Sequence, residues 1–194
     1  GFPSACTPRA RDTRRMRPIN LIVIHCSASP NGDTLFRGRV NEAGFKTPVQ
    51  IIDDWHAKRG FKRDQAARVR YNPGLRAIGY HYVIYRNGGI STGRDVTEIG
   101  AHVTGYNQKS LGICLVGTDR FTEDQWESLR DLVTRLQSLY PESRVVGHRD
   151  LSPDQNANGI VEKFEWLKTC PGFDVADWIF AGMHPLPDHL PEAQ

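Results

Sequence analysis

The sequence predicts an α/β fold, in which a single domain is built on a central mixed β-sheet flanked by helices. Two observations support this prediction. Short runs rich in isoleucine, valine and leucine, typical of buried strands, alternate along the chain with amphipathic segments that begin at helix-capping residues. The length of 194 residues favours one domain, and a composition of 39% hydrophobic and 24% charged residues is typical of globular proteins.

Three continuous apolar segments have the character of buried strands. They lie at 19–27, 110–117 and 143–148, and each is too short for a typical helix. The first strand is expected to end at His25 and the last at His148. Two histidines are therefore expected at strand ends.

The remaining strand signal is a hairpin, and two segments read as loops. Residues 79–92 predict a β-hairpin, because β-forming residues flank an Asn-Gly-Gly turn. The segment 30–46 contains glycines and prolines among charged residues, and the segment 60–76 is basic and irregular. Both are expected to be loops.

Helix starts are marked by capping residues. One helix is predicted to begin at Thr47, which is followed by a proline and a glutamine suited to a capping box, and to end at Gly60. A second begins at Thr122, where Gln125 completes the capping box, and apolar residues follow at helical spacing. Asp174 is expected to cap a last, short helix.

Charge and hydropathy exclude several classes of protein. The net charge of +3 is too small to predict nucleic-acid binding, so no nucleic-acid partner is expected. No run approaches the ~18 apolar residues of a membrane span, and the basic N-terminal segment lacks the apolar core of a secretory signal. We expect residues 1–17 to be a disordered leader or an artificial extension, 18–182 to be the folded domain, and 183–194 to be a frayed, proline-rich tail.

The four cysteines do not form a disulfide framework. None of Cys6, Cys26, Cys114 and Cys170 lies in a CxxC pair, and the pattern is not that of a small secreted scaffold. Cys114 lies in the apolar run "LGICLVG" and is expected to be a small buried side chain. Reduced thiols are therefore expected.

Three residues form a candidate zinc site. His25 and His148 each end a strand, and strand ends at one edge of an α/β sheet are where sites usually form. Cys170 follows His148 by 22 residues, just before a helix start. Two imidazoles and one thiolate would leave a fourth zinc position open, as in catalytic sites. Spacing alone leaves open that these are ordinary surface or core residues.

The surrounding motifs are more specific. The segments "IVIHCSAS", "IGYHYVIYRNGGISTGRD", "GAHVTGYNQKSLGICLVG", "VVGHRDLSPD" and "KTCPGFDV" occur in this order over about residues 19–180. Together they resemble the N-acetylmuramoyl-L-alanine amidase family of phage-T7-lysozyme type, to which animal peptidoglycan-recognition proteins are related. The resemblance implies an amidase catalytic domain at 18–182. It also implies zinc-dependent hydrolysis of the amide between N-acetylmuramic acid and L-alanine in peptidoglycan.

The resemblance also assigns residues. It implies that His25, His148 and Cys170 bind zinc, and that Tyr80 of "GYH" and Lys168 are catalytic. Lys168 would stabilise negative charge on the carbonyl oxygen, and Tyr80 would act by hydrogen bonding, since a pKa near ~10 makes tyrosine a poor base. Without the resemblance, Tyr80 would be a packing residue and Lys168 an exposed lysine.

Three further histidines are less clearly placed. His102, in "GAHVTGYN", either lines the substrate groove or packs in the fold. His81 alternates with Tyr80 and is expected to be structural, on the opposite face of its strand. His56 lies on the apolar face of the first helix and is expected in the core.

The segment 154–165 departs from the short phage pattern. Asp154, Asn156 and Asn158 fall at positions one, three and five of a twelve-residue loop, Gly159 at position six and Glu165 at position twelve. This is the calcium-binding pattern of an EF-hand, so a calcium ion is a candidate cofactor. The flanks do not look like a helix pair, and only two carboxylates occupy expected places. A hydrogen-bonded loop rich in Asx turns is the alternative.

The expected function is that of a phage or prophage endolysin, with peptidoglycan as its partner. The protein would be made in the cytoplasm, act on the bacterial cell wall, and be a monomer. One alternative is a noncatalytic peptidoglycan-binding module, against which Cys170, Lys168 and Tyr80 argue. Another is an intracellular amidase that recycles muropeptides, which the sequence leaves open.

Overall fold

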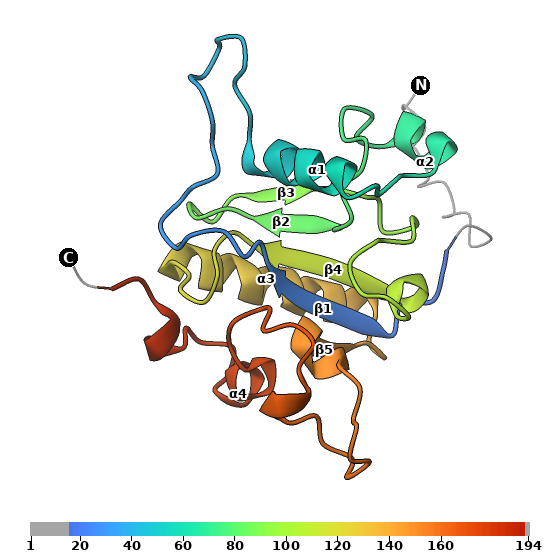
Figure 1. Cartoon of the computed structure of the whole chain (residues 1–194), viewed down its shortest axis with the longest axis vertical. Helices are drawn as coiled ribbons and strands as arrows, with labels where there is room; N and C mark the ends of the chain where they lie inside the picture. The colour runs from blue at the N-terminus through green and yellow to red at the C-terminus, as the bar shows by residue number, and fades with distance from the viewer. Residues whose placement is uncertain (1–15, 193–194) are drawn as a thin grey trace, which may run out of the picture.

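A five-stranded mixed sheet forms the centre of the molecule (Figure 1). The computed structural model describes residues 16–192. The strand order is β3-β2-β4-β1-β5, and every neighbouring pair is parallel except β2 and β3, which form an antiparallel hairpin. The predicted fold class is confirmed. The strands are β1 Leu21–Cys26, β2 Tyr82–Ile84, β3 Ile90–Thr92, β4 Ser110–Leu115 and β5 Arg144–Gly147.

The two central strands are buried on both faces. All six residues of β1 and all six of β4 are buried, which explains why their sequences are continuous apolar runs rather than alternating ones. Side chains nevertheless alternate between the two faces. Ile22 and Ile24 of β1 join the main core cluster, whereas Leu21 and Val23 join a separate cluster. His25 therefore belongs to the second face.

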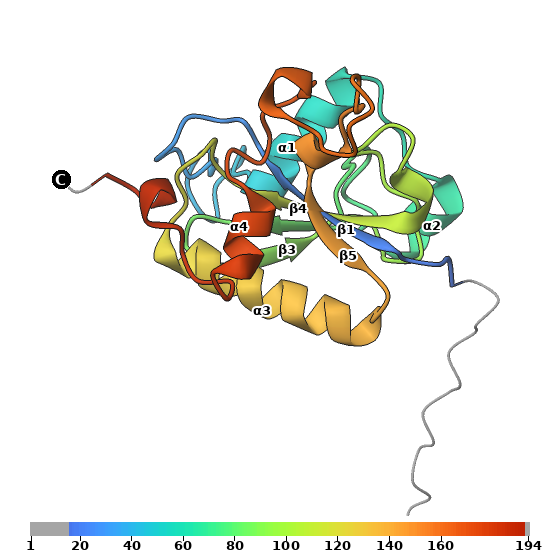
Figure 2. The same ribbon diagram turned by 90° about the horizontal axis from the view of Figure 1, so that it is seen from below.

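The helices cover the two faces of the sheet (Figure 2). On one face, Trp126 and Leu129 of α3 and Trp178 of α4 pack with Ile22 and Ile113 in the main core. On the other face, α1 packs over β2 and β4. The predicted helix starts are confirmed. At α3 both bonds of the capping box form, from Gln125 N to Thr122 Oγ1 and from Thr122 N to Gln125 Oε1, whereas at α1 the bond from Thr47 N to Gln50 Oε1 forms. The helices that pack on the sheet are α1 Pro48–Lys58, α3 Glu123–Leu139 and α4 Val175–Phe180.

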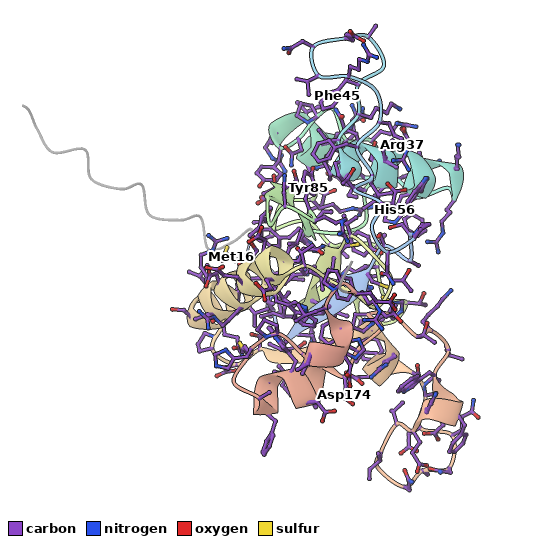
Figure 3. The ribbon with its side chains drawn as sticks, turned by 90° about the vertical axis from the view of Figure 1, so that its left-hand side faces the viewer. Met16, Arg37, Phe45, His56, Tyr85 and Asp174 are labelled. Atoms are coloured by element: carbon purple, nitrogen blue, oxygen red, sulfur yellow. The ribbon has the colours of Figure 1, made fainter. Side chains whose placement is uncertain are left out.

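One of the two predicted loops contains a short helix. The segment 60–76, expected to be a loop, contains the short helix α2 Gln65–Arg70, which buries none of its residues. It therefore has no apolar periodicity, and its only local signal is Asp64, whose side chain accepts a hydrogen bond from Ala67 N. The loop 30–46, with Arg37 and Phe45, projects from the body of the protein as expected (Figure 3).

Both ends of the described chain are tied to the domain. The tail was expected to fray, but Leu186 and Leu190 pack against the main core, and His189 O accepts hydrogen bonds from Phe121 N at 2.8 Å and Trp126 Nε1 at 3.4 Å. Arg17, assigned to the leader, is held by backbone carbonyl groups of the domain. The rest of that predicted leader, residues 1–15 with Cys6, lies outside the described residues.

Among residues 16–192, no helix is long and apolar enough to cross a membrane.

Candidate metal centre and active-site cleft

Three predicted ligands meet at the carboxyl ends of β1 and β5. The ligand atoms of His25, His148 and Cys170 all lie within 4.8 Å of one another, and theirs is the only such group of histidine, cysteine or acidic side chains among residues 16–192. Ile24 of β1 pairs with Gly147 of β5, so the next residues, His25 and His148, are neighbours with ring centroids 4.7 Å apart. The register of β1 against β5 thus brings the two candidate histidine ligands together.

Backbone hydrogen bonds bring Cys170 to these histidines from a distant part of the chain. Arg149 N donates to Cys170 O at 2.9 Å, which ties the cysteine segment to the turn after β5. Cys26 N donates to Cys170 Sγ at 3.0 Å, which ties the sulfur to the end of β1. Cys26 and Cys114 are buried, and with Cys170 they are free thiols, as expected.

The protonation states suit a soft divalent metal. Burial, reinforced by neighbouring histidines, lowers the pKa of His25 well below its usual value, and burial with the nearby Lys168 charge lowers the pKa of His148 to about 4. Both imidazoles are therefore neutral at pH 7, as metal ligation requires. A hydrogen bond with Cys26 and burial raise the pKa of the Cys170 thiol, so a metal would have to displace its proton. The donor set of two nitrogens and one sulfur fits zinc.

His102 contacts a proposed ligand directly. Its Nδ1 lies 2.8 Å from His25 Nε2, which leaves Nδ1 of His25 as the free ring nitrogen, and its Nε2 lies 3.2 Å from Ser110 Oγ. Gly112 lies under the ring: a Cβ added there would lie 2.8 Å from ring carbons of His102. The sequence left open whether His102 lines the groove or packs in the fold. His102 lines the cleft, but its contact with His25 had no sequence signal.

Tyr80 and Lys168 border the same cleft. The Tyr80 ring centroid lies 5.0 Å from that of His25, and burial raises the pKa of Tyr80 well above its usual value. The hydroxyl is therefore protonated at neutral pH. Lys168 is exposed at the rim, close enough to His148 to lower the pKa of that imidazole. The structure thus brings all five residues implied by the sequence to one place.

The cleft has a volume of about 360 Å³ and extends beyond these five residues. Arg59 and Phe61, which follow α1, line it, with the guanidinium of Arg59 4.8 Å above the Phe61 ring. Asn107 also lines it, and its Oδ1 accepts hydrogen bonds from the backbone N of His102 and Val103 at 2.9 Å. The sequence prediction missed these residues, since a basic or amide side chain in a loop carries no specific signal.

The other two histidines have structural contacts. Gly112 N donates to His81 Nδ1 at 3.0 Å, so the Nε2 of this buried histidine carries the proton and donates to Glu98 O at 2.8 Å. His56 is buried and its Nδ1 accepts from Gly79 N at 2.8 Å, as expected of a core residue, although its ring also reaches the cleft wall.

The predicted calcium loop is not gathered into a comparable metal cluster. Its acidic side chains are not gathered within 4.8 Å of one another, as the ligand atoms of His25, His148 and Cys170 are. Asp154 Oδ2 accepts a hydrogen bond from Gly159 N at 2.7 Å, and both oxygens of the buried Glu165 accept from backbone amides. In this structure the segment is a loop closed by hydrogen bonds.

Sequence comparison places this site in a known family. The N-acetylmuramoyl-L-alanine amidase family profile matches residues 15–173, which include all five site residues. The chain belongs to the N-acetylmuramoyl-L-alanine amidase family. The family resemblance seen in the motifs is therefore confirmed.

Individual relatives agree with this assignment. The endolysin of Klebsiella phage KP32 is 30% identical over 81% of this chain and 83% of its own length. The endolysin of Escherichia phage T7 is 28% identical over 85% of this chain and 88% of its own length. Among solved structures, the amidase LysC from Clostridium intestinale matches with a TM-score of 0.57 and 25% identity, over 87% of each chain.

Proposed function

We propose that this protein is a zinc-dependent N-acetylmuramoyl-L-alanine amidase, which hydrolyses the amide between N-acetylmuramic acid and L-alanine in peptidoglycan. One observation carries the proposal: the neutral imidazoles of His25 and His148 and the thiol of Cys170 converge in a cleft that Tyr80 and Lys168 also line. Family membership supports the same bond as the target.

Zinc held by His25, His148 and Cys170 would supply a Lewis acid that polarises the amide carbonyl and lowers the pKa of water towards ~7. The chain supplies the rest. The ammonium of Lys168, at the rim of the cleft, would stabilise the negative charge that develops on the carbonyl oxygen. The protonated hydroxyl of Tyr80 would orient the reacting groups by donating a hydrogen bond, because its raised pKa makes it a poor base.

His102 would act as a positioning residue. Its 2.8 Å contact with His25 Nε2 fixes the orientation of that imidazole, and outer-shell partners of this kind hold metal ligands in the required tautomer. Because His102 also lines the cleft, a contact with substrate is compatible with this role.

The biological setting follows the named relatives. Matches to two phage endolysins over more than four-fifths of the chain support a role as a phage or prophage endolysin, made in the cytoplasm and acting on the cell wall. We propose in addition that the protein acts as a monomer. Muropeptide recycling remains the alternative within the same chemistry. The two roles can be distinguished by their substrates. An endolysin should cleave intact sacculi, whereas a recycling enzyme should prefer small soluble muropeptides.

The test is digestion of purified sacculi by zinc-loaded protein. We expect new amino-terminal alanine to appear without new reducing sugar ends. Reducing ends without free alanine amino groups would show a glycosidase and contradict the proposal. Binding to sacculi without any cleavage would instead support the noncatalytic alternative. Lys168→Met serves as the matched control, because it should retain zinc but lose most of the cleavage.

A further inference from the structure

The insertion between His148 and Cys170 carries a pattern that the amidase site does not use. Residues 154–165 place side-chain oxygens at positions one, three, five, nine and twelve of a twelve-residue loop. Position six is Gly159, whose φ of +85° is the left-handed conformation that this sharp turn requires. The loop extends away from the sheet, below β5 (Figures 1 and 3). The five oxygen-bearing residues are Asp154, Asn156, Asn158, Glu162 and Glu165.

The amide oxygens at positions three and five each accept one hydrogen bond within the loop. Asn156 Oδ1 accepts a hydrogen bond from Asn158 N at 3.2 Å, and Asn158 Oδ1 accepts one from Ile160 N at 3.0 Å. A carbonyl oxygen has two lone pairs, so each amide oxygen retains one for another partner. Both amide nitrogens donate to Glu162 Oε2, which draws that carboxylate towards the same part of the loop.

A buried carboxylate oxygen in this loop has no partner at all. Asp154 Oδ1, at position one, is inaccessible to solvent and makes no hydrogen bond. A buried, unpaired carboxylate oxygen is unfavourable, and in native proteins such an atom calls for a partner such as an ion. It is the oxygen that an EF-hand loop offers first to its cation.

The loop's negative charge is also unbalanced. Among residues 16–192, none of Asp154, Glu162 and Glu165 forms a salt bridge, although Glu165 is only 1% exposed. Within the loop the three carboxylates face one lysine, Lys163, which leaves a net charge of three minus one, or two negative charges, without a paired cation. From the ligand spacing, the orphaned Asp154 oxygen and this uncompensated charge, we propose that residues 154–165 bind one calcium ion.

The chemistry of the loop selects calcium over other cations. Its donors are all oxygens, which suit hard cations, whereas zinc would prefer the imidazoles and thiol of the other site. The carboxylates do not all lie within 4.8 Å of one another, so binding would draw the loop closed. Calcium accepts six to eight oxygens in flexible geometry, whereas magnesium demands a near-ideal octahedron.

When the loop 154–165 closes around calcium, it would affect the position of residues at the amidase site, and this consequence rests on the proposed function. Glu165 is followed by Trp166, over whose ring the Arg149 guanidinium lies at 3.9 Å, and then by Leu167, whose N donates to Ser152 Oγ at 3.1 Å. These contacts connect the loop to the turn after β5. Calcium would therefore fix the segment that presents Lys168 beside the cleft.

The test is calorimetric titration of the zinc-loaded protein with calcium chloride. We expect saturable binding of one calcium per chain, with a Kd of about 10⁻⁵–10⁻³ M because asparagines replace charged ligands at two positions. Calcium at a hundredfold excess over Kd should raise the melting temperature by about 5–10 °C. No binding heat together with no shift in melting temperature would overturn the proposal.

Matched variants locate the site. Asp154→Asn keeps an oxygen that can accept the hydrogen bond from Gly159 N but removes a negative charge. Glu162→Gln likewise removes a negative charge at position nine and keeps an oxygen for the amides of Asn156 and Asn158. Each variant should bind calcium at least tenfold more weakly. Asp188→Asn, an exposed carboxylate in the tail, should bind calcium like the parent. Calcium binding retained by both loop variants would overturn the assignment, as would equal affinity for magnesium.

The binding test does not depend on amidase activity, so the two proposals can fail separately. Calcium binding without sacculus cleavage would leave the calcium site intact and refute the proposed function. Calcium binding with cleavage unaffected by calcium would support the site and overturn its influence on Lys168.

Discussion

A single methyl group on β4 should disturb the metal centre through His102. Gly112 belongs to β4, and a Cβ added there would lie 2.8 Å from Cγ and Cδ2 of His102 and 2.9 Å from its Nδ1. Carbon atoms pack best at about 3.5–4.0 Å, so in Gly112→Ala the ring must retreat by roughly 0.7 Å. The Nδ1 contact to His25 Nε2, now 2.8 Å, lies near the ring plane, so a shift of the ring along its normal would tilt this contact out of line and weaken it, because hydrogen bonds lose strength as they bend.

The expected result is weaker zinc binding in a protein that still folds. Loss of an outer-shell partner typically costs about 10–100-fold in metal affinity, which sets the upper limit for a tilted contact, and overpacking costs about 1–3 kcal/mol of stability. Zinc affinity would be measured by competition with a chromophoric chelator, and folding by circular dichroism and thermal unfolding. Gly74→Ala is the matched control, because a Cβ at Gly74 meets nothing within 4 Å.

A double-mutant cycle separates this mechanism from general damage. His102→Ala should itself weaken zinc binding, and with the imidazole gone the new methyl group meets no ring. Adding Gly112→Ala to His102→Ala should therefore cost little further zinc affinity. If Gly112→Ala alone bound zinc as tightly as the parent, or if the two effects simply added, His102 would not be the route by which Gly112 acts on His25.

Three other predictions concern the ligands, the cleft and acid stability. Cys170→Ser should lower zinc affinity by more than the ~10–100-fold cost of losing an outer-shell partner, and full zinc retention by equilibrium dialysis would remove Cys170 from the ligand set. Lys168→Met should lower kcat on sacculi about 10²–10³-fold without changing zinc content, and an unchanged kcat would exclude the charge-stabilising role. Burial lowers the pKa of His81 from 6.5 to about 3. Between these two pH values the unfolded chain therefore binds more protons than the folded protein. The free energy of unfolding should fall as the pH falls, by up to about 1.4 kcal/mol per pH unit. The test is urea unfolding of the metal-free protein between about pH 7 and about pH 4. His81→Asn keeps an acceptor for Gly112 N but cannot titrate, so its free energy of unfolding should depend less steeply on pH than that of the parent. An identical pH dependence would contradict this account.

The fold and the convergence of two candidate metal ligands were largely predictable because they depend on local patterns. Continuous apolar runs identify the buried strands, and capping boxes identify the starts of α1 and α3. His25 and His148 follow from the same patterns, since parallel neighbouring strands bring their ends together. Joining Cys170 to them needed the family motifs, because no local rule relates a loop cysteine to two strand ends.

The missed features depend on contacts between distant residues. His102 lies 77 residues from His25, and nothing within "GAHVTGYN" indicates which ring it meets. The tail was expected to fray because of its prolines, yet its leucines are half-buried against a core that only the folded sheet creates. Arg17 likewise looked like part of a solvated basic run, although its guanidinium reaches the carbonyl groups of Val96 and Gln108.

The acid–base properties of the site follow from where the sheet places its histidines. Burial keeps His25 and His148 neutral at pH 7, and it does the same for the three other histidines packed around them. A metal therefore does not compete with protons for the imidazoles near neutral pH, whereas it must displace the proton of Cys170, whose pKa is raised. Near neutral pH, metal binding at this site would be coupled to protons mainly through the thiol. In acid, protons act on the buried imidazoles as well, and so oppose both the metal and the fold.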